Sequence, residues 1–358
     1  MSSLSRHAID LIRSAVSPPS YLVLYVTNHC DLGCPFCFNR EARSAGVPEM
    51  TADQHRRLAR STGRLFELLI TGGEPFLRDD LPDILLEYLR SHSTTVITIP
   101  TSGGHPEAIG QLLNRIAPVL GSTRLHVNLS VDGTPAAHDA LRGRRGLSDD
   151  IVRSASILHR FKQQHPNLWL GVITVYGSHN ADHFDEVAQW VRNEIRPDIH
   201  DVGMERAVVM NAPPAEVLDT YRRIESLLER TGALPTGIQG TVYEAFRSHF
   251  IDSVRLGKPA WTCTAGRSLL TISVDGKVYP CEPLWLDTRS YPAFQDPCMG
   301  DLNAHDFRLD QLLRSDHARA VRTLIAQEAC RCFWECALFA SVLFTHRGWI
   351  RIARGLFR

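Results

Sequence analysis

The sequence has no excess of either charge and no long apolar run. Its 358 residues include 39 Lys and Arg against 39 Asp and Glu, so the charge balance does not favour binding to nucleic acid. No stretch approaches the roughly 18 uninterrupted apolar residues that indicate a membrane span. Residues 1–20 lack the apolar core and the cleavage site of a signal peptide. We therefore expect a cytoplasmic protein that does not span a membrane.

Nine cysteines stand out against this ordinary composition. In a reducing compartment, thiols are better explained as metal ligands than as disulfides. Cys30, Cys34 and Cys37 have Cys-x3-Cys-x2-Cys spacing, which places three thiolates on one tight loop. Three thiolates can hold three irons of a [4Fe–4S] cube and leave the fourth iron without a protein ligand. A zinc site normally needs a fourth nearby Cys or His, and here only His29 is close.

The cysteine loop follows residues 21–27, a short apolar segment typical of a buried strand. A second segment of this kind, 67–71, ends in Gly72-Gly73-Glu74. The glycines let a ligand approach the backbone closely, and Glu74 supplies a hydrogen-bond acceptor. A turn before a helix explains Gly-Gly-Glu equally well by itself. Its place after the cysteine loop favours a shared binding site.

Strand-like and helix-like segments alternate through the first two-thirds of the chain. Their order predicts a parallel sheet with right-handed crossovers and ligands at the carboxyl ends of the strands. We expect an α/β protein with a partial, TIM-like (β/α)6 barrel. The predicted strands are 21–27, 67–71, 95–100, 125–131, 168–175 and 201–206, and the predicted helices lie near 51–63, 79–92, 106–119, 149–164 and 181–194.

The cysteine spacing, with an aromatic Phe36 before the last cysteine, resembles the signature loop of the radical S-adenosylmethionine (SAM) enzymes. The resemblance implies that the open iron binds the amino and carboxylate groups of SAM. It also implies that reductive cleavage of SAM gives a 5′-deoxyadenosyl radical, which abstracts hydrogen from a substrate. The segment that hydrogen-bonds the SAM amino group in this family corresponds to Gly72, Gly73 and Glu74.

The same resemblance implies further SAM contacts at later strand ends. Ser130 and Asp132 match a motif that binds the ribose or the amino-acid end of SAM, and Arg142 matches an arginine that pairs with the SAM carboxylate. Ser102 stands where related enzymes often carry Asn. The alternative for Ser130 and Asp132 is a strand end followed by a turn. The alternative for Arg142 is a solvated charge on a loop. The expected SAM contacts are Phe36, Gly72, Gly73, Glu74, Ser102, Ser130, Asp132 and Arg142.

A second set of cysteines begins at Cys263. Cys263-x12-Gly276-x4-Cys281 resembles the opening of the SPASM and twitch domains of radical SAM enzymes, and 269–280 reads as a hairpin around Asp275-Gly276. Six cysteines cannot supply two clusters with four thiolates each, so we expect one auxiliary [4Fe–4S] cluster. Two clusters, one of them incompletely ligated, or a structural zinc are the alternatives. The expected ligands are Cys263, Cys281, Cys332 and Cys336, with Cys330 and Cys298 as alternates.

The expected organisation has five parts. They are an N-terminal extension at 1–20, the core barrel at 21–206, a connecting helical region at 207–258, the auxiliary cluster domain at 259–342 and a basic amphipathic tail at 343–358. We expect the tail to be a closing helix packed on the barrel. Contact with an anionic membrane surface or a partner is the alternative.

The resemblance implies an enzyme but not its substrate. We expect dehydrogenase-like oxidation of a sugar, aminocyclitol or natural product, with the auxiliary cluster as electron acceptor, because the signature loop begins by residue 30 and leaves no room for a peptide-recognition domain. The alternatives are a ribosomal-peptide maturase, a redox-neutral sugar dehydratase, epimerase or decarboxylase, and an inactive cluster-binding scaffold. Flavodoxin or ferredoxin is the expected electron donor. Glu205, after the sixth strand, is a candidate base or substrate contact.

Overall fold

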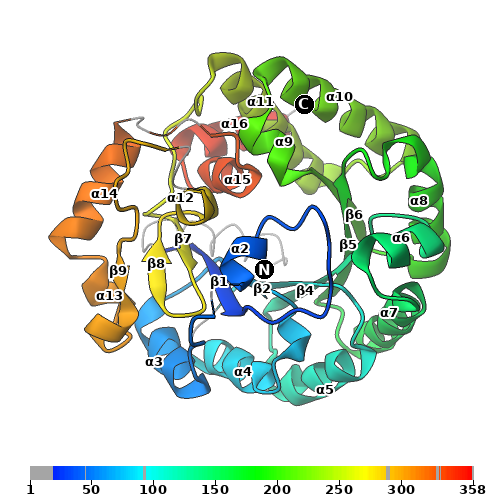
Figure 1. Cartoon of the computed structure of the whole chain (residues 1–358), viewed down its shortest axis with the longest axis horizontal. Coiled ribbons are helices and arrows are strands. Elements are labelled where there is room, and N and C mark those ends of the chain that lie inside the picture. The colour runs from blue at the N-terminus through cyan, green and yellow to red at the C-terminus, as the bar shows by residue number, and fades with distance from the viewer. Residues whose placement is uncertain are drawn as a thin grey trace.

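The computed structural model describes residues 19–44, 46–91, 94–287, 291–327, 330 and 332–356. The predicted N-terminal extension lies outside the described residues except for Pro19 and Ser20, and so do the last two residues of the predicted tail. Helices form a ring around one sheet in the described part of the chain (Figure 1).

Six parallel strands form the barrel in consecutive order, as predicted. Strand β4 shows why these sequences fold this way. Its residues alternate between buried Leu125, Val127 and Leu129 and partly exposed polar residues, because successive side chains of a strand point to opposite faces. The six strands are β1 (Tyr21–Thr27), β2 (Glu67–Gly72), β3 (Val96–Thr101), β4 (Arg124–Ser130), β5 (Leu168–Tyr176) and β6 (Ile199–Met204).

Helices between the strands cover the outside of the barrel (Figure 1). They are α3 (Ala52–Thr62), α4 (Leu81–Ser91), α5 (Pro106–Ile116), α6 (Pro135–Arg142), α7 (Leu147–Gln164) and α8 (Phe184–Trp190). Helix α3 begins with a capping box between Thr51 and Gln54, which satisfies two backbone N–H groups. The sequence analysis missed α6, a short helix that begins at Pro135 and ends at the left-handed Gly143.

The sheet continues past the barrel on one side only. Among the described strands, β6 does not pair with β1, so the barrel stays open. Strand β7 (Leu269–Ile272) pairs in parallel with the free edge of β1, and β8 (Lys277–Tyr279) and β9 (Gly300–Asp301) follow antiparallel. The hairpin predicted around Asp275-Gly276 is therefore present. The cysteine-rich C-terminal region shares its sheet with the barrel.

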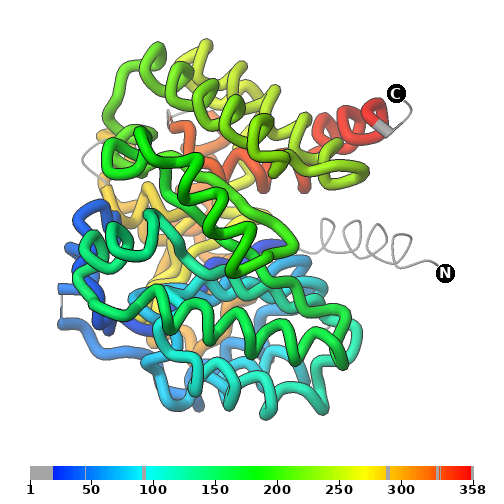
Figure 2. The backbone as a smooth tube through the Cα atoms, turned by 90° about the vertical axis from the view of Figure 1, so that its right-hand side faces the viewer, coloured from blue at the N-terminus to red at the C-terminus, as the bar shows by residue number. Residues whose placement is uncertain are grey.

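The remaining helices close the open side. Helices α9 (Arg206–Asn211), α10 (Pro214–Thr231) and α11 (Gly237–Leu256) follow β6, and α12 (Glu282–Leu286), α13 (Leu309–Leu312) and α14 (Asp316–Ala326) belong to the C-terminal region. Helices α15 (Glu335–Leu343) and α16 (His346–Leu356) lie beside α11 (Figure 2). No helix in the described part of the chain is both long and apolar enough to cross a membrane.

The predicted tail is a packed helix in this structure. The Trp349 indole donates a hydrogen bond to the Leu343 carbonyl at 2.5 Å, and Arg351 donates one to the Ser248 hydroxyl on α11. These contacts agree with a closing helix. Membrane contact by the tail remains an untested alternative.

Candidate active site

The cysteine loop lies at the carboxyl end of β1, where a parallel barrel places its ligands. Cys34 is buried, while Cys30 and Cys37 are half-buried. The Gly33 N–H donates to the Arg142 carbonyl at 3.1 Å, and the Cys37 N–H donates to the Cys34 carbonyl at 3.3 Å. These bonds fix the loop against the end of α6 and turn it back on itself.

Two arginines of the short helix α2 (Arg40–Arg43) hold the loop from the other side. Arg40 donates to the Cys34 carbonyl at 2.7 Å. Arg43 donates to the Cys30 carbonyl at 3.1 Å, and its second nitrogen lies 3.7 Å from the Cys37 sulfur. The sequence analysis missed both residues. The sequence pattern that could have identified them is a pair of arginines three and six residues after Cys37, where positive charge stabilises thiolates.

The chemistry of these donors fits an iron–sulfur cluster. Burial raises the pKa of the Cys30 and Cys34 thiols, and Arg43 and Arg142 act against that shift. Within the described residues, no three His, Cys, Asp or Glu side chains are arranged to share a single metal ion. A cube does not require such convergence, because each of its thiolate ligands binds a different iron.

The end of β2 reaches the same loop. The N–H groups of Gly73 and Glu74 donate to the Thr27 and His29 carbonyls at 2.7 and 2.8 Å. A Cβ on Gly72 or Gly73 would collide with these carbonyl oxygens, and Gly72 has a φ of 138°. The two glycines therefore have a structural reason in addition to the expected ligand role, because only glycine allows so close an approach of two backbones.

The Glu74 carboxylate links the ends of β2 and β3. It accepts hydrogen bonds from the Thr101 hydroxyl at 2.8 Å, the Ser102 N–H at 2.7 Å and the Phe76 N–H at 3.1 Å. The Ser102 hydroxyl in turn accepts from the Gly104 N–H at 3.2 Å. In this arrangement Ser102 contributes its backbone to the Glu74 site. Direct contact of Glu74 and Ser102 with SAM remains a prediction.

Asp132 and Arg142 form a buried ion pair beside the cysteine loop. Arg142 donates from Nε and Nη2 to one Asp132 oxygen at 2.9 and 2.5 Å, and the Val175 N–H donates to the other oxygen at 2.8 Å. The Asp132 side chain is fully buried. In this geometry Asp132 orients Arg142, and the direct contact of Asp132 with SAM stays a prediction. Ser130, half-buried, ends β4 two residues earlier.

An aromatic stack completes this wall of the site. The Arg142 guanidinium lies 5.8 Å from the centre of the Phe36 ring, and Phe36 stacks on His179 with centres 4.8 Å apart. The Glu205 N–H donates to the Tyr176 carbonyl at 3.0 Å. A Cβ on Gly177 would touch both the Glu205 carboxylate and the His179 ring. Glu205 therefore lies on the side of the mouth where Phe36 is held.

The C-terminal cysteines divide into two groups. Burial raises the pKa of Cys263 to about 12 and that of Cys281 well above its usual value, and nearby thiols add to both shifts. The thiols that face one another in this way are Cys263, Cys281, Cys330 and Cys332. The structure therefore brings together three of the four expected ligands, with the alternate Cys330 as the fourth.

Cys336 and Cys298 lie apart from that group. Cys336 is in the first turn of α15, where Glu282, Arg206 and Glu335 are its charged neighbours and burial raises its pKa to about 12. An ion pair between Arg206 and Glu335 holds this turn. The other expected ligands are not among the neighbours that affect the pKa of Cys336. The Cys298 thiol donates to the Gly300 carbonyl at 3.4 Å in β9.

A buried carboxylate ties the second cysteine group to the barrel. Glu282, next to Cys281, accepts a hydrogen bond from the Tyr25 hydroxyl of β1 at 2.5 Å and another from the Trp334 indole at 2.9 Å. The Arg206 guanidinium lies 4.4 Å from the centre of the Trp334 ring. Burial and the adjacent Glu282 raise the pKa of Tyr25 well above its usual value. The sequence contained no signal for this bridge.

Two family models match the chain. The model of the radical SAM superfamily matches residues 24–191, and the model of the SPASM iron–sulfur cluster-binding domain matches residues 263–337. The chain belongs to the radical SAM superfamily. Within it, the chain is one of the members that carry a C-terminal SPASM domain, so it binds SAM at a [4Fe–4S] cluster and has an auxiliary iron–sulfur site.

Curated relatives include the PqqA peptide cyclase of Xanthomonas campestris pv. campestris, which is 32% identical over 175 residues, covering 47% of this chain and 43% of the relative. The pre-heme d1 synthase of Dinoroseobacter shibae is 33% identical over 138 residues, covering 38% of this chain and 32% of the relative. The matches thus span less than half the length of either relative.

Solved structures with a similar fold include those of anSMEcpe and SuiB. The structure of anSMEcpe with bound AdoMet has a TM-score of 0.58 at 16% identity and covers 95% of this chain and 97% of its own. The structure of Streptococcus suis SuiB bound to precursor peptide SuiA has a TM-score of 0.56 at 19% identity and covers 89% and 70%. At these identities the likeness establishes the fold.

Proposed function

We propose that this radical SAM enzyme modifies a peptide, as a ribosomal-peptide maturase. The observation that carries the proposal is the match to a peptide cyclase at 32% identity. Two other proteins with a similar fold have structures with a bound peptide: anSMEcpe with a Kp18Cys peptide, and SuiB with the precursor peptide SuiA. This proposal takes the alternative of the sequence analysis in preference to its main expectation, the oxidation of a small molecule.

Cys30, Cys34 and Cys37 would hold the first cluster, and Arg40 and Arg43 would offset its negative charge. When bound, the cluster and SAM supply reductive cleavage of the sulfonium and abstraction of a hydrogen atom. Asp132 accepts hydrogen bonds from Nε and Nη2 of Arg142. Nη1 of Arg142 would then be available to donate to the SAM carboxylate. Glu74 presents acceptor oxygens for the SAM amino group.

A second set of residues would hold one auxiliary cluster. We assign Cys263, Cys281, Cys330 and Cys332 to it, because these thiols face one another and Cys336 does not face them. Glu282 positions two of the ligand segments, since it lies next to Cys281 and binds Trp334, two residues after Cys332. Tyr25 joins the same carboxylate to β1 and so to the strand that leads into the cysteine loop.

The substrate would enter the open mouth between these two regions. Glu205 lies on the side of Phe36 and His179, and the Arg206–Glu335 ion pair lies on the side of the auxiliary cysteines. Glu205 is our candidate for the base that accepts a substrate proton. A carboxylate in this position can accept from a peptide N–H or take up a proton released during oxidation.

A second function is favoured by a separate observation. The 33% identity to pre-heme d1 synthase supports a small, cyclic substrate in place of a peptide. Under this alternative the same SAM-binding residues act, and the auxiliary site serves a small-molecule oxidation or a redox-neutral reaction.

The two functions are separated by assay of the reconstituted protein. Anaerobic reconstitution should give about eight iron and eight sulfide per chain, and dithionite with SAM should give 5′-deoxyadenosine. The protein is then incubated with each short peptide encoded beside its gene, and the products are examined by mass spectrometry. Loss of two hydrogens from one peptide supports the maturase. Unchanged peptides together with turnover of a sugar, aminocyclitol or tetrapyrrole would refute it.

A further inference from the structure

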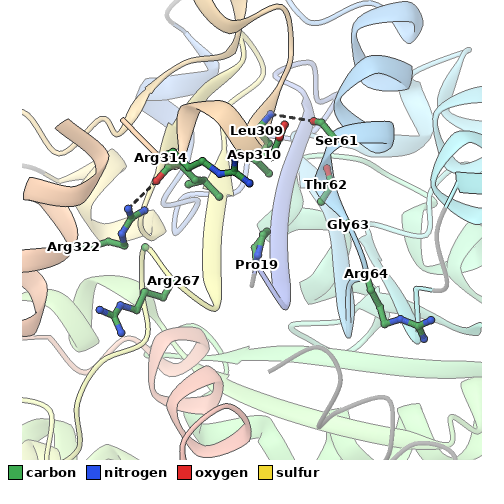
Figure 3. Close-up of a pocket in the computed structure, with 12 residues that line it drawn as sticks. Pro19, Ser61, Thr62, Gly63, Arg64, Arg267, Leu309, Asp310, Arg314 and Arg322 are labelled. Atoms are coloured by element: carbon green, nitrogen blue, oxygen red, sulfur yellow. Dashed lines mark hydrogen bonds between the residues drawn. The ribbon is translucent and has the colours of Figure 1, made fainter. Parts of the chain in front are cut away.

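A pocket at the amino ends of β1, β2 and β7, on the side of the sheet away from the cysteine loop, is rich in arginine (Figure 3). Arg64 lies on one side of it and Arg267, Arg314 and Arg322 on the other. Asp310 is the one acidic residue among those that line the pocket. Neither the expected SAM site nor the substrate mouth uses this surface.

Three of the arginines, Arg267, Arg314 and Arg322, form no ion pair with a carboxylate in the described part of the chain. Arg308 already binds the Asp310 carboxylate through two bonds of 3.0 and 3.1 Å. Arg322 donates to the Leu313 carbonyl at 2.7 Å. Burial lowers the pKa of Arg322, and the neighbouring Arg267 adds to the shift. This surface therefore attracts anions.

The pocket borders the segments that carry the auxiliary cysteines. Gly266, three residues after Cys263, lines it and donates its N–H to the carbonyl of Pro280, which precedes Cys281, at 3.2 Å. A Cβ on Gly266 would lie 3.2 Å from the Arg322 side chain. Arg322 thus packs on the junction of two ligand segments, and its helix α14 leads into the segment of Cys330.

We propose that this arginine pocket is the docking surface for an acidic one-electron carrier protein that exchanges electrons with the auxiliary site. The proposal rests on the proposed ligand set for that site. The arginines come from separate elements, and the guanidinium groups of Arg64 and Arg267 point to different sides (Figure 3). Such a spread suits several carboxylates on a protein surface better than a single phosphate. Each docking event moves one electron between carrier and enzyme, so that one is oxidised as the other is reduced, and no covalent bond changes.

The test measures binding of purified flavodoxin to the reconstituted enzyme by titration calorimetry. Charge reversal in the triple variant Arg267→Glu, Arg314→Glu and Arg322→Glu should weaken binding at least about tenfold and reduce the dependence of Kd on salt between about 50 and 300 mM. The single variant Arg314→Glu, whose side chain forms no ion pair among the described residues, should weaken binding by about threefold. Iron content and 5′-deoxyadenosine formation with dithionite should stay at the level of the unmodified enzyme in both variants.

A matched control makes the same change of charge on another face. Arg115, Arg153 and Arg222 are more than half exposed on α5, α7 and α10, and their triple reversal to Glu should leave flavodoxin binding within about twofold. Equal weakening in both triple variants, or none in either, would overturn the proposal. So would loss of inorganic phosphate binding with unchanged flavodoxin binding, because the pocket would then serve a small anion. Normal flavodoxin binding by an arginine variant that has lost iron would also overturn the proposal, because the arginines would then stabilise the auxiliary site without forming a docking surface.

Discussion

The two cysteine regions of this protein provide their thiols with different surroundings. In the first, Cys34 is buried, Cys30 and Cys37 are half-buried, and Arg40, Arg43 and Arg142 lie around the loop. In the second, Cys263 is half-buried and Cys281, Cys330 and Cys332 are buried. After burial itself, the largest influences on the pKa of Cys281 and Cys330 are the neighbouring thiols.

The difference reflects two tasks. An iron that must bind and release SAM needs an opening, and the protein supplies positive charge in advance to stabilise thiolates beside that opening. A closed site needs no such opening. Its thiols become thiolates only when irons arrive, so binding of the cluster and ordering of that segment are linked. Glu282 then becomes the link between the regions, because it binds Tyr25 of the barrel and Trp334 of the auxiliary region.

The strongest way to separate the two regions is to remove one set of thiols. We expect the triple variant Cys30→Ala, Cys34→Ala and Cys37→Ala to lower 5′-deoxyadenosine formation by about 1,000-fold or more, because no iron remains to bind SAM. Iron should fall from about eight to about four per chain. An unchanged rate of SAM cleavage would contradict the assignment of the first region.

The second prediction tests which cysteines belong to the closed region. We expect Cys330→Ala to lose the auxiliary cluster and to retain about four iron per chain, while Cys336→Ala retains about eight. The reason is that Cys330 faces the other thiols and Cys336 faces Glu282 and Arg206. Iron analysis and electron paramagnetic resonance of the reduced protein provide the measurement. The reverse pattern would restore the ligand set expected from the sequence.

The third prediction concerns acid sensitivity of the first region. His138 is fully buried and its Nδ1 accepts the Asp132 N–H at 3.0 Å. Burial, with a smaller effect of Arg142, lowers its pKa to about 4. The unfolded chain, with a His pKa of about 6.5, therefore binds more protons at this side chain between these values, and His138 alone should lower the free energy of unfolding by about 3 kcal/mol as pH drops from about 6.5 to about 4. Burial also lowers the pKa of His55, His126, His200 and His249, so the total fall should be larger.

Urea unfolding of the apo-protein as a function of pH tests this. The variant His138→Gln should show a fall about 3 kcal/mol smaller than that of the unmodified protein, since the amide oxygen accepts the same N–H without titrating. His183 is 69% exposed, and His183→Gln should follow the unmodified protein. If both variants keep the full slope, another group dominates the acid sensitivity.

The smallest expected effect lies at the link between the regions. We expect Glu282→Gln to lower the free energy of unfolding by about 1–3 kcal/mol, because an amide has only one acceptor oxygen for the Tyr25 and Trp334 donors. The thermal midpoint of the apo-protein should drop accordingly. Glu244 is 67% exposed on α11, and Glu244→Gln should show no drop. Equal midpoints for the two variants would show that the bridge adds nothing to stability.

Much of the fold was predictable because it depends on local patterns. The apolar segment 21–27 is the strand Tyr21–Thr27, and the helices predicted near 51–63 and 106–119 are α3 and α5 within a few residues. Helix α6 was missed because its signal is short. The pairing of β7 with β1 could not be read from the sequence, since a strand's edge partner depends on contacts between residues far apart in the chain.

For the site, the sequence by itself determined the chemistry and the tertiary structure decided the geometry. The spacing of Cys30, Cys34 and Cys37 specifies a cluster loop, because three sulfur ligands so close in the chain must lie close in space. Our preference for Cys330 over Cys336 depends on the surroundings of Cys336, where Arg206 of α9 forms an ion pair with Glu335 of α15. The task of Asp132 depends on Arg142 reaching it from the end of α6. Arg206 and Glu335 lie far apart in the chain, and the Asp132–Arg142 pair forms only because α6 turns back toward the end of β4. Neither contact can be read from residue spacing.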